Sequence, residues 1–157
     1  MKLILKTMLA FIVLTSTVKA NEFNCLVEAL YHEARSESLI AILSVANVIL
    51  TRKESNNFPN TICKVVHQGK YWKGNPVRDR CHFSYWCDGN AEKYNDIKGL
   101  IKSINVAEMA LKGVQVKLTV GATHYHASYV TPKWASDPRF KSLGQSGTHL
   151  FYIDMRE

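Results

Sequence analysis

Residues 39–50 form an almost unbroken apolar stretch, and this feature limits the possible folds of the chain more than any other. Within it the polar positions are Ser44 and Asn47, and Thr51 follows at the same spacing of three to four residues. That spacing and the length favour a helix over the alternative of a fully buried strand. A helix that is apolar on nearly every side has to be surrounded by other elements. The stretch therefore predicts a central, buried helix, and Ser38 is placed to cap its first turn.

The segment before this stretch, from about Asn24, is predicted to be a helix with one acid on its apolar side. Leu26, Leu30 and Glu33 share that side, at spacings of three and four residues. An inward carboxylate loses hydration, which favours its protonated form and lets it donate a proton near neutral pH. Glu33 is therefore the candidate catalytic acid, and a structural Glu paired with Arg or backbone N–H groups is the alternative. The polar residues expected on the opposite, solvent-facing side are Glu28, His32 and Arg35.

Residues 1–20 have the features of a secretory signal peptide. Two lysines precede a short apolar core at residues 8–14, and Val18 and Ala20 are the small residues that a signal peptidase recognises. The apolar core falls short of the roughly 20 residues needed to span a bilayer. We expect cleavage after Ala20, with an uncleaved anchor as the alternative. The remaining residues, 21–157, are enough for one domain and hardly for two.

The charge of the chain argues against nucleic acid as its partner. The formal net charge is +7, but three lysines and no acid lie in residues 1–20, so the exported part carries +4. Its basic residues are scattered, which is not the footprint of a nucleic-acid-binding surface. A mild positive charge suits an anionic polymer such as a bacterial wall. We expect a monomer that is secreted or periplasmic, with no cofactor and no stable membrane insertion after cleavage.

Four cysteines, all in the exported part, predict two disulfides. An even count is typical of proteins from an oxidising compartment. Three pairings are possible. Cys81–Cys87 would close a short loop and leave Cys25–Cys63 to tie the first helix to a later segment, and we favour this pairing. A zinc site is the alternative, although the spacing contains no C-x-x-C pair.

The rest of the chain predicts shorter elements. A short helix is expected at 62–67, a long ordered loop braced by Cys81–Cys87 at 68–90, and two short strands at 121–126 and 149–153 with a loop between them. An amphipathic helix is expected at 97–111. Its apolar face would comprise Ile97, Leu100, Ile101, Ile104, Ala107 and Leu111.

Several common catalytic motifs are absent from the sequence. His32-Glu33 begins like the helix of a zinc protease, but position 36 is not histidine, and no G-x-S-x-G, phosphate-loop or dinucleotide motif occurs. His124 and His126 could ligate a metal with His149 as the third ligand, which leaves a metal-dependent amidase or peptidase of the cell wall as one hypothesis. We favour the interpretation that they line a groove or hydrogen bond to each other, with no metal site.

An inward acid, an aromatic loop and a polar aromatic hairpin are together typical of an enzyme that acts on glycan. Ordinary glycosidases use two carboxylates. A lytic transglycosylase needs one, which first protonates the glycosidic oxygen and then removes the proton of the muramyl hydroxyl that attacks the anomeric carbon. A non-catalytic peptidoglycan-binding module is the hypothesis from a different class.

Blocks along the whole exported part resemble, in order, the cell wall hydrolases of the spore-cortex-lytic type. The resemblance implies a small lysozyme-like α+β fold, mainly α with a short β-hairpin, that cleaves the MurNAc-GlcNAc β-1,4 bond of peptidoglycan. Glu33 matches the catalytic Glu of the family's E-A-R-G-E pattern, and Ser84, Tyr125 and His149 match positions that line its cleft. The chain departs from the family pattern at Ser36. The blocks are 25–52, 58–60, 81–89, 121–126, 132–134 and 149–152.

Overall fold

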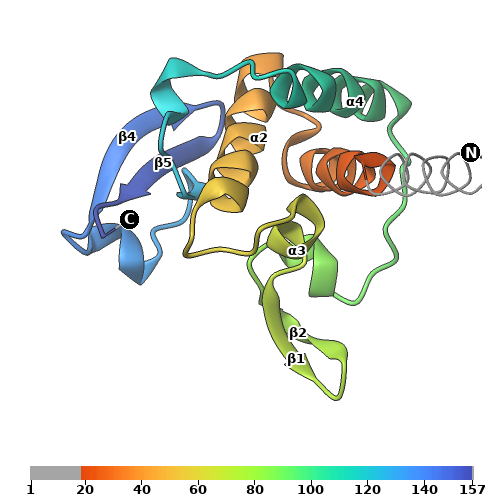
Figure 1. Cartoon of the computed structure of the whole chain (residues 1–157), viewed down its shortest axis with the longest axis horizontal. Helices are drawn as coiled ribbons and strands as arrows, with labels where there is room; N and C mark the ends of the chain where they lie inside the picture. Colours follow the sequence, from red (N-terminus) through yellow and green to blue (C-terminus); the bar gives the residue numbers. More distant parts are fainter. Residues whose placement is uncertain (1–18, 157) are drawn as a thin grey trace, which may run out of the picture.

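The computed structural model describes residues 19–156, so the predicted signal peptide lies, except for its last two residues, outside the described part. Helix α2, Leu39–Glu54, occupies the centre of the molecule with the other elements around it (Figure 1). Every residue from Ala41 to Ile49 is buried, and the Ser38 side chain accepts a hydrogen bond from the Ala41 N–H. The prediction of a central, capped helix is confirmed. Within the described residues, no helix is long and apolar enough to cross a membrane.

The N-terminal helix covers residues 19–34 of the described part, so it begins before the predicted position at Asn24. Its apolar side, with Leu26, Ala29 and Leu30, is fully buried in the same core as α2. A disulfide joins Cys25 to Cys63 in helix α3, Ile62–Val66. The Glu22 carboxylate accepts a hydrogen bond from the first backbone N–H of α3 at 2.6 Å. These two links fix α3 against the N-terminal helix.

The first half of the predicted loop at 68–90 is instead a β-hairpin. Strand β1, Gly69–Trp72, pairs antiparallel with β2, Asn75–Cys81. The two turn residues, Lys73 and Gly74, both have positive φ, at 48° and 83°. Two-residue turns of this type match the twist of the strands, and glycine in such a turn is the signal that the sequence interpretation overlooked. The short 3-10 helix η1, Ser84–Cys87, follows, and the second predicted disulfide, Cys81–Cys87, joins it to the hairpin.

A three-stranded antiparallel sheet packs on the other side of α2 (Figure 1). It contains the two predicted strands as β3, His124–Ala127, and β5, His149–Asp154. The loop predicted between them contains a strand as well, β4, Phe140–Ser146, which pairs with β5. Its sequence is mostly polar, and Gly144 lies where the pairing register shifts, so it lacks the alternation that identifies a strand. The fold is α+β and mainly helical, as predicted.

Helix α4, Ile97–Leu111, forms where predicted, but only part of its predicted apolar face is buried. Ala107 is buried and Leu100 and Ile104 pack against the core, as predicted. The exposed side chains include Ile97 and Ile101, which the apolar pattern placed inside. Small residues allow α4 to approach its neighbours closely: a Cβ at Gly99 would lie 2.9 Å from the Cβ of Arg35. Close approach has therefore decided which face is buried. The buried residues of α4 are Gly99, Ser103, Val106, Ala107 and Ala110.

Candidate active site

A pocket of about 600 Å³ lies where the end of the N-terminal helix, the segment around η1, and strands β3 and β5 meet. All four predicted site residues, Glu33, Ser84, Tyr125 and His149, line this one pocket. They come from four separate segments of the chain, namely the N-terminal helix, η1, β3 and β5, so the fold brings them together. The other residues of the lining are His32, Arg35, Arg52, His82, Tyr85, Asp88, His126, Ala127, Tyr129 and Val130.

The Glu33 side chain is partly buried and faces the pocket. Tyr125 donates a hydrogen bond from its Oη to Oε2 of Glu33 at 3.1 Å. Burial raises the pKa of Glu33 to about 7, and this outweighs the hydrogen bond from Tyr125 and the charge of Arg52, which both lower the pKa. Near neutral pH the carboxyl group is therefore divided between its acid and base forms, and it is open to a ligand in the pocket.

Tyr125 on β3 is partly buried and packs against the core. Its ring lies 5.3 Å from the ring of His149 and 5.8 Å from that of Phe151, both on the adjacent strand β5. Burial raises the pKa of Tyr125 well above its ordinary value. The hydroxyl therefore stays protonated and acts as a fixed hydrogen-bond donor toward Glu33.

Arg52 of α2 is a buried cation behind the pocket, with 7 % of its surface exposed. Its Nε donates to the Thr123 carbonyl at 2.7 Å, and its guanidinium lies 5.2 Å and 5.5 Å from the ring centres of Phe58 and Phe83. The sequence alone did not identify Arg52 as a residue of the site. The signal for its position was present, because Arg52 continues the buried stripe of α2 at spacings of three and four residues.

His32 and Arg35 were predicted on the solvent-facing side of the first helix. Arg35 is exposed, as predicted, whereas His32 is partly buried, and both line the pocket. The His32 ring is half-buried and stacks on Tyr85 of η1, with 4.8 Å between ring centres. Glu28 on the same side is also partly buried, and burial together with the charge of Glu92 raises its pKa. The Cys81–Cys87 disulfide and η1 fold this segment back over the helix. The covering depends on contacts distant in sequence, which helical spacing could not indicate.

The three histidines considered as metal ligands are not brought together. His124 and His126 alternate with Tyr125 along β3, so they leave the strand on the opposite face from Tyr125 and His149, although His126 also lines the rim of the pocket. His126 Nε2 lies 3.0 Å from the Tyr152 hydroxyl instead. Within the part of the chain that the structure describes, no three or more His, Cys, Asp or Glu side chains are grouped to hold a metal ion.

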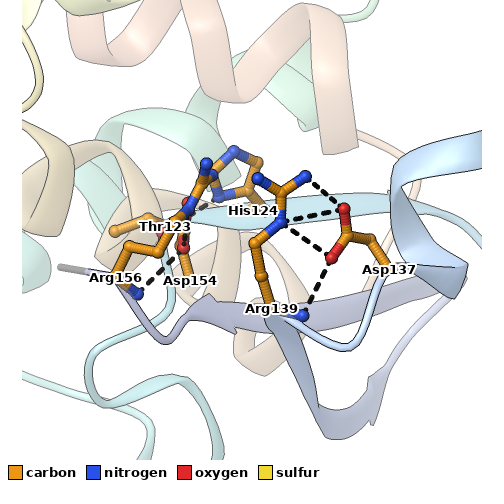
Figure 2. A network of polar contacts seen from close by, with 6 residues as sticks. All are labelled: Thr123, His124, Asp137, Arg139, Asp154 and Arg156. Atoms are coloured by element: carbon orange, nitrogen blue, oxygen red, sulfur yellow. Dashed lines mark hydrogen bonds and ion pairs between the residues drawn. The ribbon is translucent and has the colours of Figure 1, made fainter.

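A polar and aromatic cluster supports β3 from the far face of the sheet (Figure 2). His124 Nδ1 lies 3.0 Å from the Thr123 hydroxyl, and its ring packs against Phe140. Burial and the charge of Arg52 lower the pKa of His124 to about 4, so the ring is neutral at ordinary pH. Beside it, Arg139 forms an ion pair with Asp137 and Arg156 with Asp154. The cluster fixes the strand that carries Tyr125.

Comparison with known proteins gave one family and two related structures. A family model described as "Cell Wall Hydrolase" matches residues 36–152. The catalytic domain of the Bacillus cereus SleB protein is 22% identical, with a TM-score of 0.61 over 85% of this chain and 90% of that chain. The catalytic domain of the germination-specific lytic transglycosylase SleB from Bacillus anthracis is 23% identical, with a TM-score of 0.63 over 84% and 93%. A search of curated proteins found no match.

The two kinds of comparison support different parts of the account. At these identities the structural likeness concerns the fold, and it confirms the expected fold class. The family match contains Ser84, Tyr125 and His149 but begins at Ser36, after Glu33. The role of the acid therefore depends on its own geometry.

Proposed function

This chain belongs to the cell wall hydrolase family, and on that premise we propose that it cleaves the glycan strands of peptidoglycan with Glu33 as its catalytic acid. One observation carries the proposal: a carboxyl group whose pKa is raised to about 7 faces a pocket that family-matched residues line. An acid whose pKa lies near the working pH is well suited to both donating and accepting a proton.

The proposed reaction is that of a lytic transglycosylase. Glu33 gives its proton to the glycosidic oxygen between MurNAc and GlcNAc, and the bond from this oxygen to the anomeric carbon of MurNAc breaks. The Glu33 carboxylate then takes the proton of the muramyl 6-hydroxyl, whose oxygen bonds to that carbon and closes a 1,6-anhydro ring. One carboxyl group serves both steps, as acid and then as base.

Hydrolysis by water is the second candidate, because the pocket lining contains one further acid, Asp88. Hydrogen bonds with Asn90 lower the pKa of Asp88, so it is ionised at neutral pH. An ionised carboxylate opposite a protonated one is the arrangement that inverting glycosidases use to activate water. That reaction would leave a reducing sugar in place of the anhydro ring.

Three further residues are proposed to hold the substrate or the acid. Tyr125 stabilises the carboxylate that Glu33 becomes after the first step, because its hydroxyl already donates to Oε2. His149 is kept neutral because burial lowers its pKa, and its buried Nδ1 has no hydrogen-bond partner among the described residues. Ser84 offers an exposed hydroxyl in the same lining. The last two are suited to binding sugar hydroxyl or amide groups.

We infer that the protein works outside the cytoplasm. Two disulfides are typical of proteins from oxidising compartments, and the substrate of a cell wall hydrolase lies there too. The predicted cleavage after Ala20 and the monomeric state are part of this proposal. N-terminal sequencing of the exported protein and its elution volume in size-exclusion chromatography test them.

The products released from purified sacculi test the function. Mass spectrometry should find soluble disaccharide peptides that end in anhydro-muramic acid, lighter by one water than their reducing counterparts. Reducing ends would replace the transglycosylase by hydrolysis with Asp88 as the base. Peptides free of sugar would indicate an amidase or peptidase, and pelleting with sacculi without soluble products would indicate a binding module. Each of the last two results would contradict the proposal.

A further inference from the structure

The hairpin of β1 and β2, residues 69–81, projects from the helices and is called the hairpin arm here (Figure 1). It forms a two-stranded sheet that pairs with no other described strand, and none of its residues is buried. Isolated two-stranded hairpins are marginally stable in water. The arm therefore depends on specific contacts at its base.

One face of the arm supplies those contacts. Tyr71 donates from its hydroxyl to the His67 carbonyl at 2.7 Å and accepts from Trp86 Nε1 at 2.9 Å. The Trp86 ring in turn stacks on the His67 ring. Tyr71 is therefore occupied in fixing the arm to α3 and η1.

The other face carries an aromatic ring that has no such role. Side chains alternate along a strand, and the pairing is regular at Tyr71 and Trp72, so Trp72 points to the face opposite Tyr71. Trp72 is 71 % exposed, although it is one of the largest apolar side chains. Fixing the strand through Tyr71 therefore presents the indole of Trp72 to solvent.

The charged side chains of the arm are mostly cations. Its exposed cations are Lys70, Lys73, Arg78 and Arg80, and its only acid is Asp79. Four cations and one acid give the arm +3 of the +4 of the exported chain, so the positive charge is concentrated in the arm and not scattered as the sequence suggested. Such a surface complements a polymer that carries both flat sugar rings and carboxylates.

The arm is also directly continuous with the wall of the pocket. The His82 N–H donates to the Gln68 carbonyl at 2.9 Å, and the Cys81–Cys87 disulfide joins the end of β2 to η1. Ser84 and Tyr85 in η1 line the pocket. A long polymer could thus contact the arm and the pocket together without a hinge between the two sites.

We propose that the face of the hairpin arm that carries Trp72 is a second binding surface for peptidoglycan, separate from the pocket. Trp72 stacks on a sugar ring, and the cations of the arm pair with carboxylates of the stem peptides. The surface holds the enzyme on the insoluble polymer while the pocket acts on a single bond. This inference rests on the proposed function, because it takes the same polymer as the ligand.

Retention on sacculi tests the proposal directly. In a Glu33→Gln background, which stops digestion during the assay, Trp72→Ala should weaken pelleting with sacculi about tenfold, and Ile97→Ala should not change it. Ile97 is the matched control, because it is 63 % exposed on α4, away from the arm. Equal pelleting of the two variants would overturn the proposal, and so would binding to anionic lipid vesicles that exceeds binding to sacculi.

A second measurement separates failure of this inference from failure of the proposed function. With Glu33 intact, Trp72→Ala should lower the ratio of the rate on sacculi to the rate on a short soluble glycan at least threefold. An unchanged ratio would contradict a surface outside the pocket. Absence of cleavage by the parent protein would instead contradict the proposed function, and the pelleting assay would still decide whether the arm binds. Sacculi stripped of stem peptides should bind more weakly and with less dependence on salt, as charge pairing requires.

Discussion

At the scale of single residues, the pKa of Glu33 results from opposing influences that can be identified in the structure. Loss of hydration favours its neutral form, and the Tyr125 hydroxyl and the Arg52 charge favour its ionised form. Burial dominates, so the pKa rises to about 7, but the two polar neighbours keep it from rising further. The acid is therefore suited to alternate between two protonation states in one catalytic cycle.

The pH dependence of the rate follows from this balance. The first step needs Glu33 protonated, so kcat/KM should fall as the pH rises through about 7 and then decrease about tenfold per pH unit. Initial rates on sacculi at constant ionic strength check this. A rate that stays flat between pH 6 and pH 9 would be incompatible with Glu33 as the acid.

Replacement of Tyr125 by Phe should shift that dependence upward. The hydroxyl stabilises the charged form of Glu33, so its loss should move the midpoint of the falling limb up by about one pH unit. The rate at pH 6 should fall about tenfold, because the carboxyl group loses the donor that orients it. Tyr152→Phe is the control, because its hydroxyl contacts His126 and not Glu33. If both variants keep the wild-type midpoint, Tyr125 is only a packed aromatic residue.

At the scale of elements, the sequence predicted secondary structure correctly where a single hydrophobic pattern determined it. The run from Leu39 to Leu50 could only be a buried helix or strand, and its polar line identified the helix. β4 was missed because its polar residues and Gly144 resemble a loop, and its pairing with β5 supplies the order that its composition does not. The buried face of α4 was predicted only in part for a similar reason, since Gly99 permits a contact that an apolar pattern does not reveal.

The turn between β4 and β5 offers a test of such close contacts. Gly147 has a φ of 58°, and a Cβ there would lie 2.7 Å from the Cβ of Ala41 and against the Glu37 carboxylate. Gly147→Ala should therefore destabilise the protein by about 2 to 3 kcal/mol, from backbone strain and overpacking together. Urea unfolding followed by circular dichroism measures this change.

Gly113 provides the matched control for that substitution. It also has a positive φ, of 88°, but a Cβ there would meet nothing within 4 Å. Gly113→Ala should therefore cost only the backbone contribution of about 1 kcal/mol. Equal costs at the two positions would show that the contact between the turn and the start of α2 contributes nothing.

At the scale of the whole molecule, the two disulfides should act differently. Cys25–Cys63 spans 38 residues and Cys81–Cys87 spans 6. In the chain-entropy model, their removal should cost about 4 and about 2 kcal/mol, respectively. Each variant with both cysteines of one disulfide replaced by Ser should therefore unfold at a lower urea concentration than the wild type. The variant without Cys25–Cys63 should unfold at the lowest concentration. The variant without Cys81–Cys87 should lose less stability but more activity than the variant without Cys25–Cys63, because this bond holds η1 in the pocket wall. A larger loss of activity in the variant without Cys25–Cys63 would contradict that role.

Only some of the residues that form the pocket could be predicted from the sequence alone. Helical spacing predicted that Glu33 points inward, and the resemblance to a family predicted Ser84, Tyr125 and His149 as site residues. The fold places all four around one pocket. No pattern showed that η1 would cover His32. Such contacts join segments that are distant in the chain, and they depend on the disulfide and the packing of the whole domain.

The raised pKa of Glu33 also makes the stability of the protein depend on pH. The native pKa of Glu33, about 7, lies above the ordinary value of 4.5, so the native state binds more protons than the unfolded state between these values. Stability contributed by this group is therefore lost as the pH rises from about 4.5 to 7. Glu33→Gln removes the buried charge and should leave the protein folded and, at pH 8, more stable than the wild type.

The most direct test of the account is the activity of Glu33→Gln on purified sacculi at pH 6, beside Glu108→Gln, which alters an exposed acid of α4. The amide cannot donate the proton that the glycosidic oxygen needs, so release of soluble muropeptides should fall at least a hundredfold. Glu108→Gln should release them at the wild-type rate. Digestion by folded Glu33→Gln at the wild-type rate would contradict the account.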